Sequence, residues 1–138
     1  MSNRRKMAVA LSSLCLVCAA LHAPPAVAGP DAAVETLMTQ ALKDMAGKEA
    51  LMITVDYPPG ASSPVHRHDA HAFVYVIEGA IVMSVKGGQE VTLTAGQTFY
   101  EAPADIHTVS RNASDTRRAR FVVWMLKNKG APFFTPVP

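Results

Sequence analysis

The sequence predicts an all-β protein, a small antiparallel sandwich or barrel with one helix in front of it. Beyond Ala50, short segments rich in β-branched and aromatic residues alternate with turn residues at regular spacing, which is typical of such folds. Two of these segments, 73–77 and 121–126, are apolar on both faces, so both of their faces should be covered. The sequence contains no internal repeat and no linker long enough to separate two domains.

Residues 1–28 have the pattern of a signal peptide. Arg4, Arg5 and Lys6 form a positive start, residues 7–21 are an uncharged and mostly apolar run, and residues 26–28 are the small residues that a signal peptidase requires. The apolar run is shorter than the roughly 20 residues of a membrane span. We therefore expect an exported protein, periplasmic or secreted, that has no membrane attachment after cleavage.

The expected mature product is a single domain of about 110 residues, long enough for a modest core. Both cysteines, Cys15 and Cys18, lie in the leader, so disulfides and thiolate chemistry are excluded from the mature chain. Removing the leader's three basic residues from thirteen leaves ten against eleven acidic residues, a formal charge of −1. This charge argues against a nucleic-acid partner.

One amphipathic helix is predicted within residues 29–49. Asp31 is a suitable N-cap and Gly47 a suitable end. Between them, apolar residues recur at helical spacing: Val34, Leu37, Met38, Ala41, Leu42 and Met45. We expect a helix of about 15 residues that packs over one face of the sheet.

Seven strands are predicted after this helix, each ended by glycine, proline or a polar turn. They are residues 51–57, 73–78, 80–85, 91–94, 98–101, 107–111 and 120–126. The barrel would thus occupy residues 50–126, followed by a tail at 127–138. The second apolar face of 73–77 and 121–126 must be covered by the helix, by the Phe133–Phe134 tail or by another subunit, and we expect a homodimer.

Histidines are concentrated in one stretch of the chain. Of the four histidines outside the leader, His66, His68 and His71 lie within six residues, and the fourth is His107. Side chains alternate faces along a strand, so His66 and His68 project to the same side. Two imidazoles side by side are half of a transition-metal site.

The spacing of these residues resembles the two motifs of the cupins. The first comprises Gly60, His66, His68 and Gly79, and the second comprises Gly96, Pro103, His107 and Asn112. Ala104 stands where a glycine is common. The likeness covers roughly residues 50–126. It implies a double-stranded β-helix (jelly-roll) cupin barrel, with a metal ion inside that is held by histidines from both motifs.

The resemblance assigns His66, His68 and His107 as metal ligands, but the glutamate usual in the first motif falls at Ala72. His71 would replace it if the chain bulges by one residue, because a slip of one reverses the face; otherwise His71 is peripheral. Glu101 has two interpretations. It either turns inward, near the metal or as an acceptor that orients a ligand imidazole, or it is an exposed acid at a strand end.

Imidazole ligands suit iron, nickel, copper or zinc better than magnesium or calcium. We expect one such divalent metal and a small-molecule substrate or ligand. The activity to expect is dioxygenase-like, on a small diketone, enol or flavonol-like compound; the alternative is a non-catalytic periplasmic module that binds or senses a small ligand. The predicted cavity walls are Val74, Val76, Ile81, Met83 and Val109.

Overall fold

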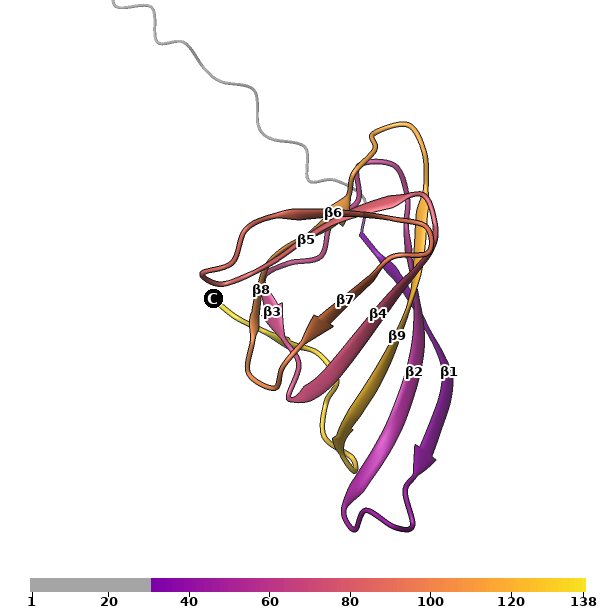
Figure 1. The fold of residues 1–138 in the computed structure, drawn as a ribbon, viewed down its shortest axis with the longest axis vertical. Helices are drawn as coiled ribbons and strands as arrows, with labels where there is room; N and C mark the ends of the chain where they lie inside the picture. Colours follow the sequence, from indigo (N-terminus) through magenta and orange to yellow (C-terminus); the bar gives the residue numbers. More distant parts are fainter. Residues whose placement is uncertain (1–30) are drawn as a thin grey trace, which may run out of the picture.

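Figure 1 shows the computed structural model, which describes residues 31–138 as two sheets facing one another. The predicted leader lies outside the described residues. One sheet has the order β1-β2-β9-β4-β7 and the other β10-β3-β8-β5-β6, and every strand pairing within them is antiparallel. The strands are β1 (Ala33–Ala41), β2 (Lys48–Tyr57), β3 (His66–Arg67), β4 (Ala70–Glu78), β5 (Ala80–Val85), β6 (Val91–Thr94), β7 (Thr98–Glu101), β8 (Ile106–Asn112), β9 (Ala119–Asn128) and β10 (Thr135–Pro136).

The all-β prediction is confirmed for this part of the chain, and the predicted helix is wrong. Residues 31–138 contain no helix, and therefore none that could cross a membrane. The segment with helical spacing forms β1, which pairs with β2 along the sheet edge. Its residues are exposed throughout, so backbone pairing with β2 holds this segment in place, and burial of an apolar face does not. Pairing instead satisfies the backbone groups at the free edge of β2.

The alternation of β1 is interrupted by a bulge, which explains why its sequence looked helical. The register with β2 shifts between Thr36 and Met38, which leaves Leu37 as an extra residue. A bulge changes the side on which the following residues lie. A strict period of two was therefore absent from the sequence.

The strand ends that were predicted correctly are those next to glycines. The bounds of β5, β6 and β7 are those predicted, because Gly79, the glycines at 87–88 and Gly96 break the chain between them. Gly79 and Gly96 both have positive φ, at 72° and 89°, where a side chain is strained. Ala104 occupies the same region at φ 73°, which agrees with the expectation that a glycine is common there.

The core lies between the sheets and is formed by the inward side chains of alternating strands. Along β9 and most of β4 every second residue is buried. The outward residues Phe73, Tyr75 and Ile77 of β4 remain 44–50% exposed. No segment within residues 31–138 covers this face, because β1 lies at the sheet edge and Phe133 and Phe134 line a pocket elsewhere.

Candidate metal centre

Three predicted ligands, His66, His68 and His107, come together inside the molecule. His66 in β3 lies directly opposite His107 in β8, and His68 follows one residue after β3. All three are buried. The ring centroid of His66 lies 4.9 Å from that of His68 and 5.0 Å from that of His107, and the His68 and His107 centroids are 5.9 Å apart.

Backbone carbonyls fix the orientation of two of these rings. The Nδ1–H of His66 donates to the Pro64 carbonyl at 2.7 Å, and the Nδ1–H of His68 donates to the Phe133 carbonyl. Because a carbonyl only accepts, each neutral ring then carries its lone pair on Nε2. Burial, aided by the neighbouring His68 and His107, lowers the pKa of His66 to about 4. Such orientation by an outer acceptor is usual for histidines that bind metals.

Glu101 lies in the same cluster and is only 2% exposed. Its Oε2 is 2.5 Å from Nε2 of His107 and 3.6 Å from Nε2 of His68. Neither Glu101 Oε2 nor either ring nitrogen of His107 has a hydrogen-bond partner, because the nitrogen and oxygen are close without being aligned to share a proton. The inward interpretation of Glu101 is therefore the one that the structure supports.

His71 does not join the cluster. It lies exposed on β4, where its Nδ1 is 2.7 Å from the Tyr100 hydroxyl. The bulge that its ligand role required is missing, since the register with β9 is continuous from Ala70 to Val76. Strand alternation therefore turns His71 outward and buries Ala72. The assignment of His71 as a possible ligand is corrected accordingly.

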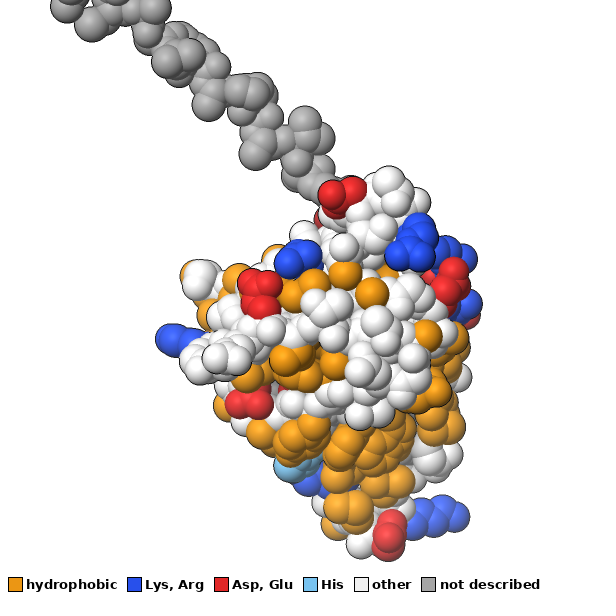
Figure 2. Space-filling view, turned by 45° about the horizontal axis from the view of Figure 1, so that its top comes forward, with side chains coloured by type: hydrophobic (Ala, Val, Ile, Leu, Met, Phe, Trp, Pro, Cys, Tyr) orange, Lys and Arg blue, Asp and Glu red, His pale blue; other side chains and the backbone are white. Residues whose placement is uncertain are grey.

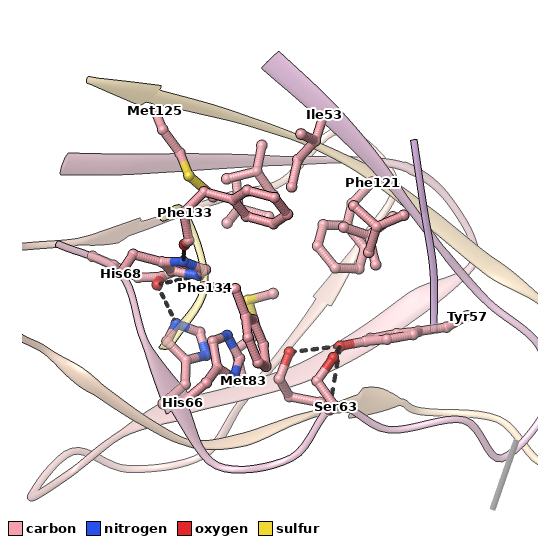
Figure 3. A pocket seen from close by; sticks show the side chains of 17 residues that line it. Ile53, Tyr57, Ser63, His66, His68, Met83, Phe121, Met125, Phe133 and Phe134 are labelled. Atoms are coloured by element: carbon pink, nitrogen blue, oxygen red, sulfur yellow. Dashed lines mark hydrogen bonds and ion pairs between the residues drawn. The ribbon is translucent and has the colours of Figure 1, made fainter. Parts of the chain in front are cut away.

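An apolar cavity of about 60 Å³ adjoins the histidines and Glu101 (Figure 3). Of the predicted walls, Val74 and Met83 line it, whereas Val76 and Ile81 are buried in the core beside it. The other lining side chains, which the sequence did not single out, are mainly Ile53, Val55, Phe121, Val123 and Met125.

Val109 was predicted to face this cavity, and Ser110 does so instead. The register between β5 and β8 pairs Ser84 with Val109 and Val85 with His107, which leaves Thr108 unpaired. This bulge moves the next inward position by one residue. Ser110 thus joins Tyr57 and Ser63 in a hydroxyl cluster at the cavity wall, with oxygen distances to Tyr57 of 2.8 and 2.6 Å.

The C-terminal tail closes the cavity on the side of the histidines. Phe134 stacks on His66 with ring centroids 4.4 Å apart, and the Phe133 carbonyl holds His68. Strand β10 pairs with β3, and the Val137 amide donates to the Val65 carbonyl. Figure 3 shows both phenylalanines beside the two imidazoles. No sequence signal indicated this contact, because its acceptor is a backbone group 65 residues beyond His68.

The donor set fits a divalent transition metal in its chemistry. A buried carboxylate is stabilised by a cation beside it, and the oriented Nε2 atoms of His66 and His68 are suitable ligands. The side chains are not already positioned around a metal ion. Within residues 31–138, no group of three or more His, Cys, Asp or Glu side chains has the spacing that would hold one. Two ligands of one ion lie about 3 Å apart, so His107 and Glu101 would have to separate slightly on binding.

Two facing antiparallel sheets around a buried histidine cluster define a jelly-roll domain of the double-stranded β-helix class. The family description "Cupin domain" matches residues 53–125, more than half of the 138-residue chain. The chain therefore belongs to the cupin family, as the motifs predicted. No curated protein matches it.

Solved structures share this fold at low sequence identity. DMSP lyase DddQ from Ruegeria pomeroyi is 17% identical with a TM-score of 0.56, and the match covers 64% of this chain and 43% of the lyase. A protein with a double-stranded β-helix domain from Klebsiella pneumoniae is 16% identical with a TM-score of 0.62, covering 78% and 85%. An oxalate oxidase is 26% identical with a TM-score of 0.54, covering 64% and 46%. This chain thus spans less than half the length of the two enzymes.

Proposed function

We propose that this protein is an exported cupin that binds one divalent transition metal through His66, His68 and His107 and acts on a small diketone or enol in a dioxygenase-like reaction. The observation that carries the proposal is that three buried imidazoles lie together beside the buried carboxylate of Glu101. A divalent cation would be stabilised by this carboxylate, and imidazole donors select iron, nickel, copper or zinc.

The size of the cavity argues for a small substrate. About 60 Å³ holds a few water molecules or a compound of a few atoms, well below the roughly 300 Å³ at which pockets for drug-sized ligands begin. A three-ring flavonol does not fit while Phe133 and Phe134 are in place. The likeness to oxalate oxidase agrees in scale, since oxalate has only two carbons.

The residues of the chain have separable roles in this proposal. The Pro64 and Phe133 carbonyls orient His66 and His68. The apolar walls and Phe134 exclude water, which strengthens electrostatic interactions in the cavity. When bound, the metal supplies Lewis acidity toward a substrate oxygen and, if it is iron, redox chemistry with dioxygen. The Tyr57 hydroxyl, whose pKa is raised by burial, donates to the Ser110 carbonyl and is hydrogen-bonded to the Ser63 and Ser110 hydroxyls. This hydroxyl cluster gives the cavity wall one polar region toward which a polar end of the substrate would point.

Metal retention tests the ligand assignment. We expect His66→Ala and His107→Ala to abolish metal binding, measured by elemental analysis of protein purified from the periplasm. His71→Ala is the matched control, because His71 lies exposed on β4, and it should retain metal at the level of the wild type. Unchanged metal content in the His66 and His107 variants would contradict the proposal.

Turnover separates the enzyme from a non-catalytic module on the same fold. The mainly apolar cavity also suits a periplasmic protein that binds or senses a small ligand. Oxygen uptake by the metal-loaded protein with a panel of small diketones distinguishes the two functions. Uptake that disappears in His107→Ala supports the enzyme, whereas metal binding with no turnover supports the binding module.

Export is a separate part of the proposal. Its support is the basic start, apolar run and small residues of positions 1–28. Mass spectrometry of protein from the periplasmic fraction should find a chain that begins near Gly29. A full-length chain in the cytoplasm would contradict export without bearing on the metal site.

A further inference from the structure

Glu101 and Ala72 lie directly opposite one another on the neighbouring strands β7 and β4. Both point inward, with exposed fractions of 2% and 0%. Residues so paired in an antiparallel sheet have Cβ atoms about 5 Å apart. A carboxylate carried by either position would therefore extend into the same space beside His107.

The small side chain at position 72 leaves room for the carboxylate of Glu101. Ala72 is fully buried against the core, so any longer side chain there would compete with Glu101 for volume. The first cupin motif usually carries its glutamate at the position of Ala72. The chain thus has no carboxylate at position 72 of β4, and it has an inward carboxylate, that of Glu101, at the paired position of the neighbouring strand β7.

Nitrogen atoms of two imidazoles lie close to Glu101 Oε2. Nε2 atoms of His107 and His68 lie 2.5 and 3.6 Å from it, yet no donor is aligned with it. His68 already donates its Nδ1–H to the Phe133 carbonyl, which leaves its Nε2 without a proton in the neutral ring. The carboxylate oxygen and this nitrogen lone pair repel one another unless a proton or a metal ion lies between them. A metal ion has the further property that both imidazoles and the carboxylate can bind it at the same time.

We propose that Glu101 is the carboxylate ligand of the metal site, supplied from β7 in exchange for the one missing at Ala72 on β4. The inference rests on the proposed function, because it concerns the same metal. It gives a donor set of three imidazoles and one carboxylate. Such a set favours divalent iron, manganese, nickel or zinc over monovalent copper, which prefers soft sulfur ligands.

Binding of Co²⁺ to the metal-free protein tests this ligand directly. We expect Glu101→Gln, which keeps size and shape, to lower the Co²⁺ affinity about 100-fold or more, beyond the roughly 10–100-fold typical of losing an outer partner. The visible absorption of bound Co²⁺ should also change, because one ligand is replaced. Glu35→Gln, at an exposed site on β1, is the matched control. Unchanged affinity and spectrum in Glu101→Gln would overturn the inference.

The double variant Ala72→Glu/Glu101→Ala tests the exchange between strands. We expect its Co²⁺ affinity to return to within about tenfold of the wild type, because a carboxylate then reaches the site from β4. Affinity that stays at the level of Glu101→Gln in a folded double variant would overturn the exchange. Loss of Co²⁺ in His66→Ala together with full retention in Glu101→Gln would refute only this inference. Retention in His66→Ala as well would refute the proposed function itself.

Discussion

Gly79 has no room for a side chain in the turn between β4 and β5. Its φ is 72°, and an added Cβ would lie 2.4 Å from the Arg118 carbonyl oxygen and 2.9 Å from Cα of Ala119. Both contacts are with backbone atoms, which cannot rotate away. The glycine of the first cupin motif is thus required by the close approach of the backbone at Arg118 and Ala119 as well as by its dihedral angle.

We predict that Gly79→Ala lowers the free energy of unfolding by at least about 2 kcal/mol, because backbone strain and overlap add. Gly87→Ala is the matched control: φ there is 84°, and no atom lies within 4 Å of an added Cβ. It should cost only about 1 kcal/mol, the strain of the left-handed conformation. Urea unfolding of both variants measures the difference, and equal losses would contradict the role of the close approach.

Residue patterns predicted which histidines come together better than they predicted what surrounds them. The spacing of His66, His68 and His107 was sufficient to predict their proximity, because strand alternation and the paired motifs place them together; their role as metal ligands stays a prediction. The role of Glu101 stayed open because it depends on the register of β7 against β4. Pairing register is decided by tertiary packing, and no local pattern at Glu101 reports it.

At the scale of elements, a buried ion pair joins β2 and β9 near one end of their strand pairing. Glu49 and Lys127 lie opposite one another, and Nζ of Lys127 donates to Oε1 of Glu49 at 2.5 Å. The Gly130 amide donates to the same oxygen at 3.2 Å. The hydrogen bond from Lys127, with a smaller contribution from Gly130, lowers the pKa of Glu49 below 4.5.

We predict that this pair makes stability depend on acid pH. A carboxyl whose pKa is lowered by folding stabilises the protein above its unfolded pKa, and the contribution is lost as pH falls through the folded pKa. Lys127→Met should therefore be less stable than the wild type at about pH 7, and the gap should narrow below about pH 4. Urea unfolding across this pH range measures the difference in stability. Glu49→Gln should likewise reduce the loss of stability at acid pH. A gap independent of pH would contradict the assignment.

Sequence patterns predicted the strands bounded by glycine and failed where a bulge intervenes. The bounds of β5, β6 and β7 matched because a glycine stops each neighbour. β1 was predicted as a helix because the bulge at Leu37 hides its alternation. The bulge at Thr108 likewise exchanged Val109 for Ser110 at the cavity. A bulge has no fixed sequence signature, so these errors share one physical origin.

At the scale of the molecule, the outer face of β4, β7 and β9 is apolar and uncovered within residues 31–138. The ring centroid of Phe73 lies 5.2 Å from those of Tyr100 and Trp124, and Tyr75 is half exposed beside them. In the view of Figure 2, hydrophobic side chains gather on the lower part of the molecule. An exposed apolar surface of this kind is usually an interaction site.

We predict that this face packs against a second copy of the chain, since two identical apolar faces that pack on one another close as a twofold dimer. Light scattering coupled to gel filtration should give twice the monomer mass. Tyr75→Glu should shift the mass toward the monomer, because a charge would be buried at the interface. Thr92→Glu, exposed on β6 of the other sheet, is the control. A monomeric wild type at all concentrations would refute the dimer.

The hydrogen bond from His68 to the Phe133 carbonyl makes the orientation of this imidazole depend on a segment far along the chain. The two residues are 65 positions apart, and Phe133 follows β9, which ends at Asn128. A protease that cuts between Asn128 and Phe133 would leave β2, β4 and β9 paired and remove the acceptor that holds the His68 ring. Such trimming would disorder the histidine cluster without unfolding the larger sheet.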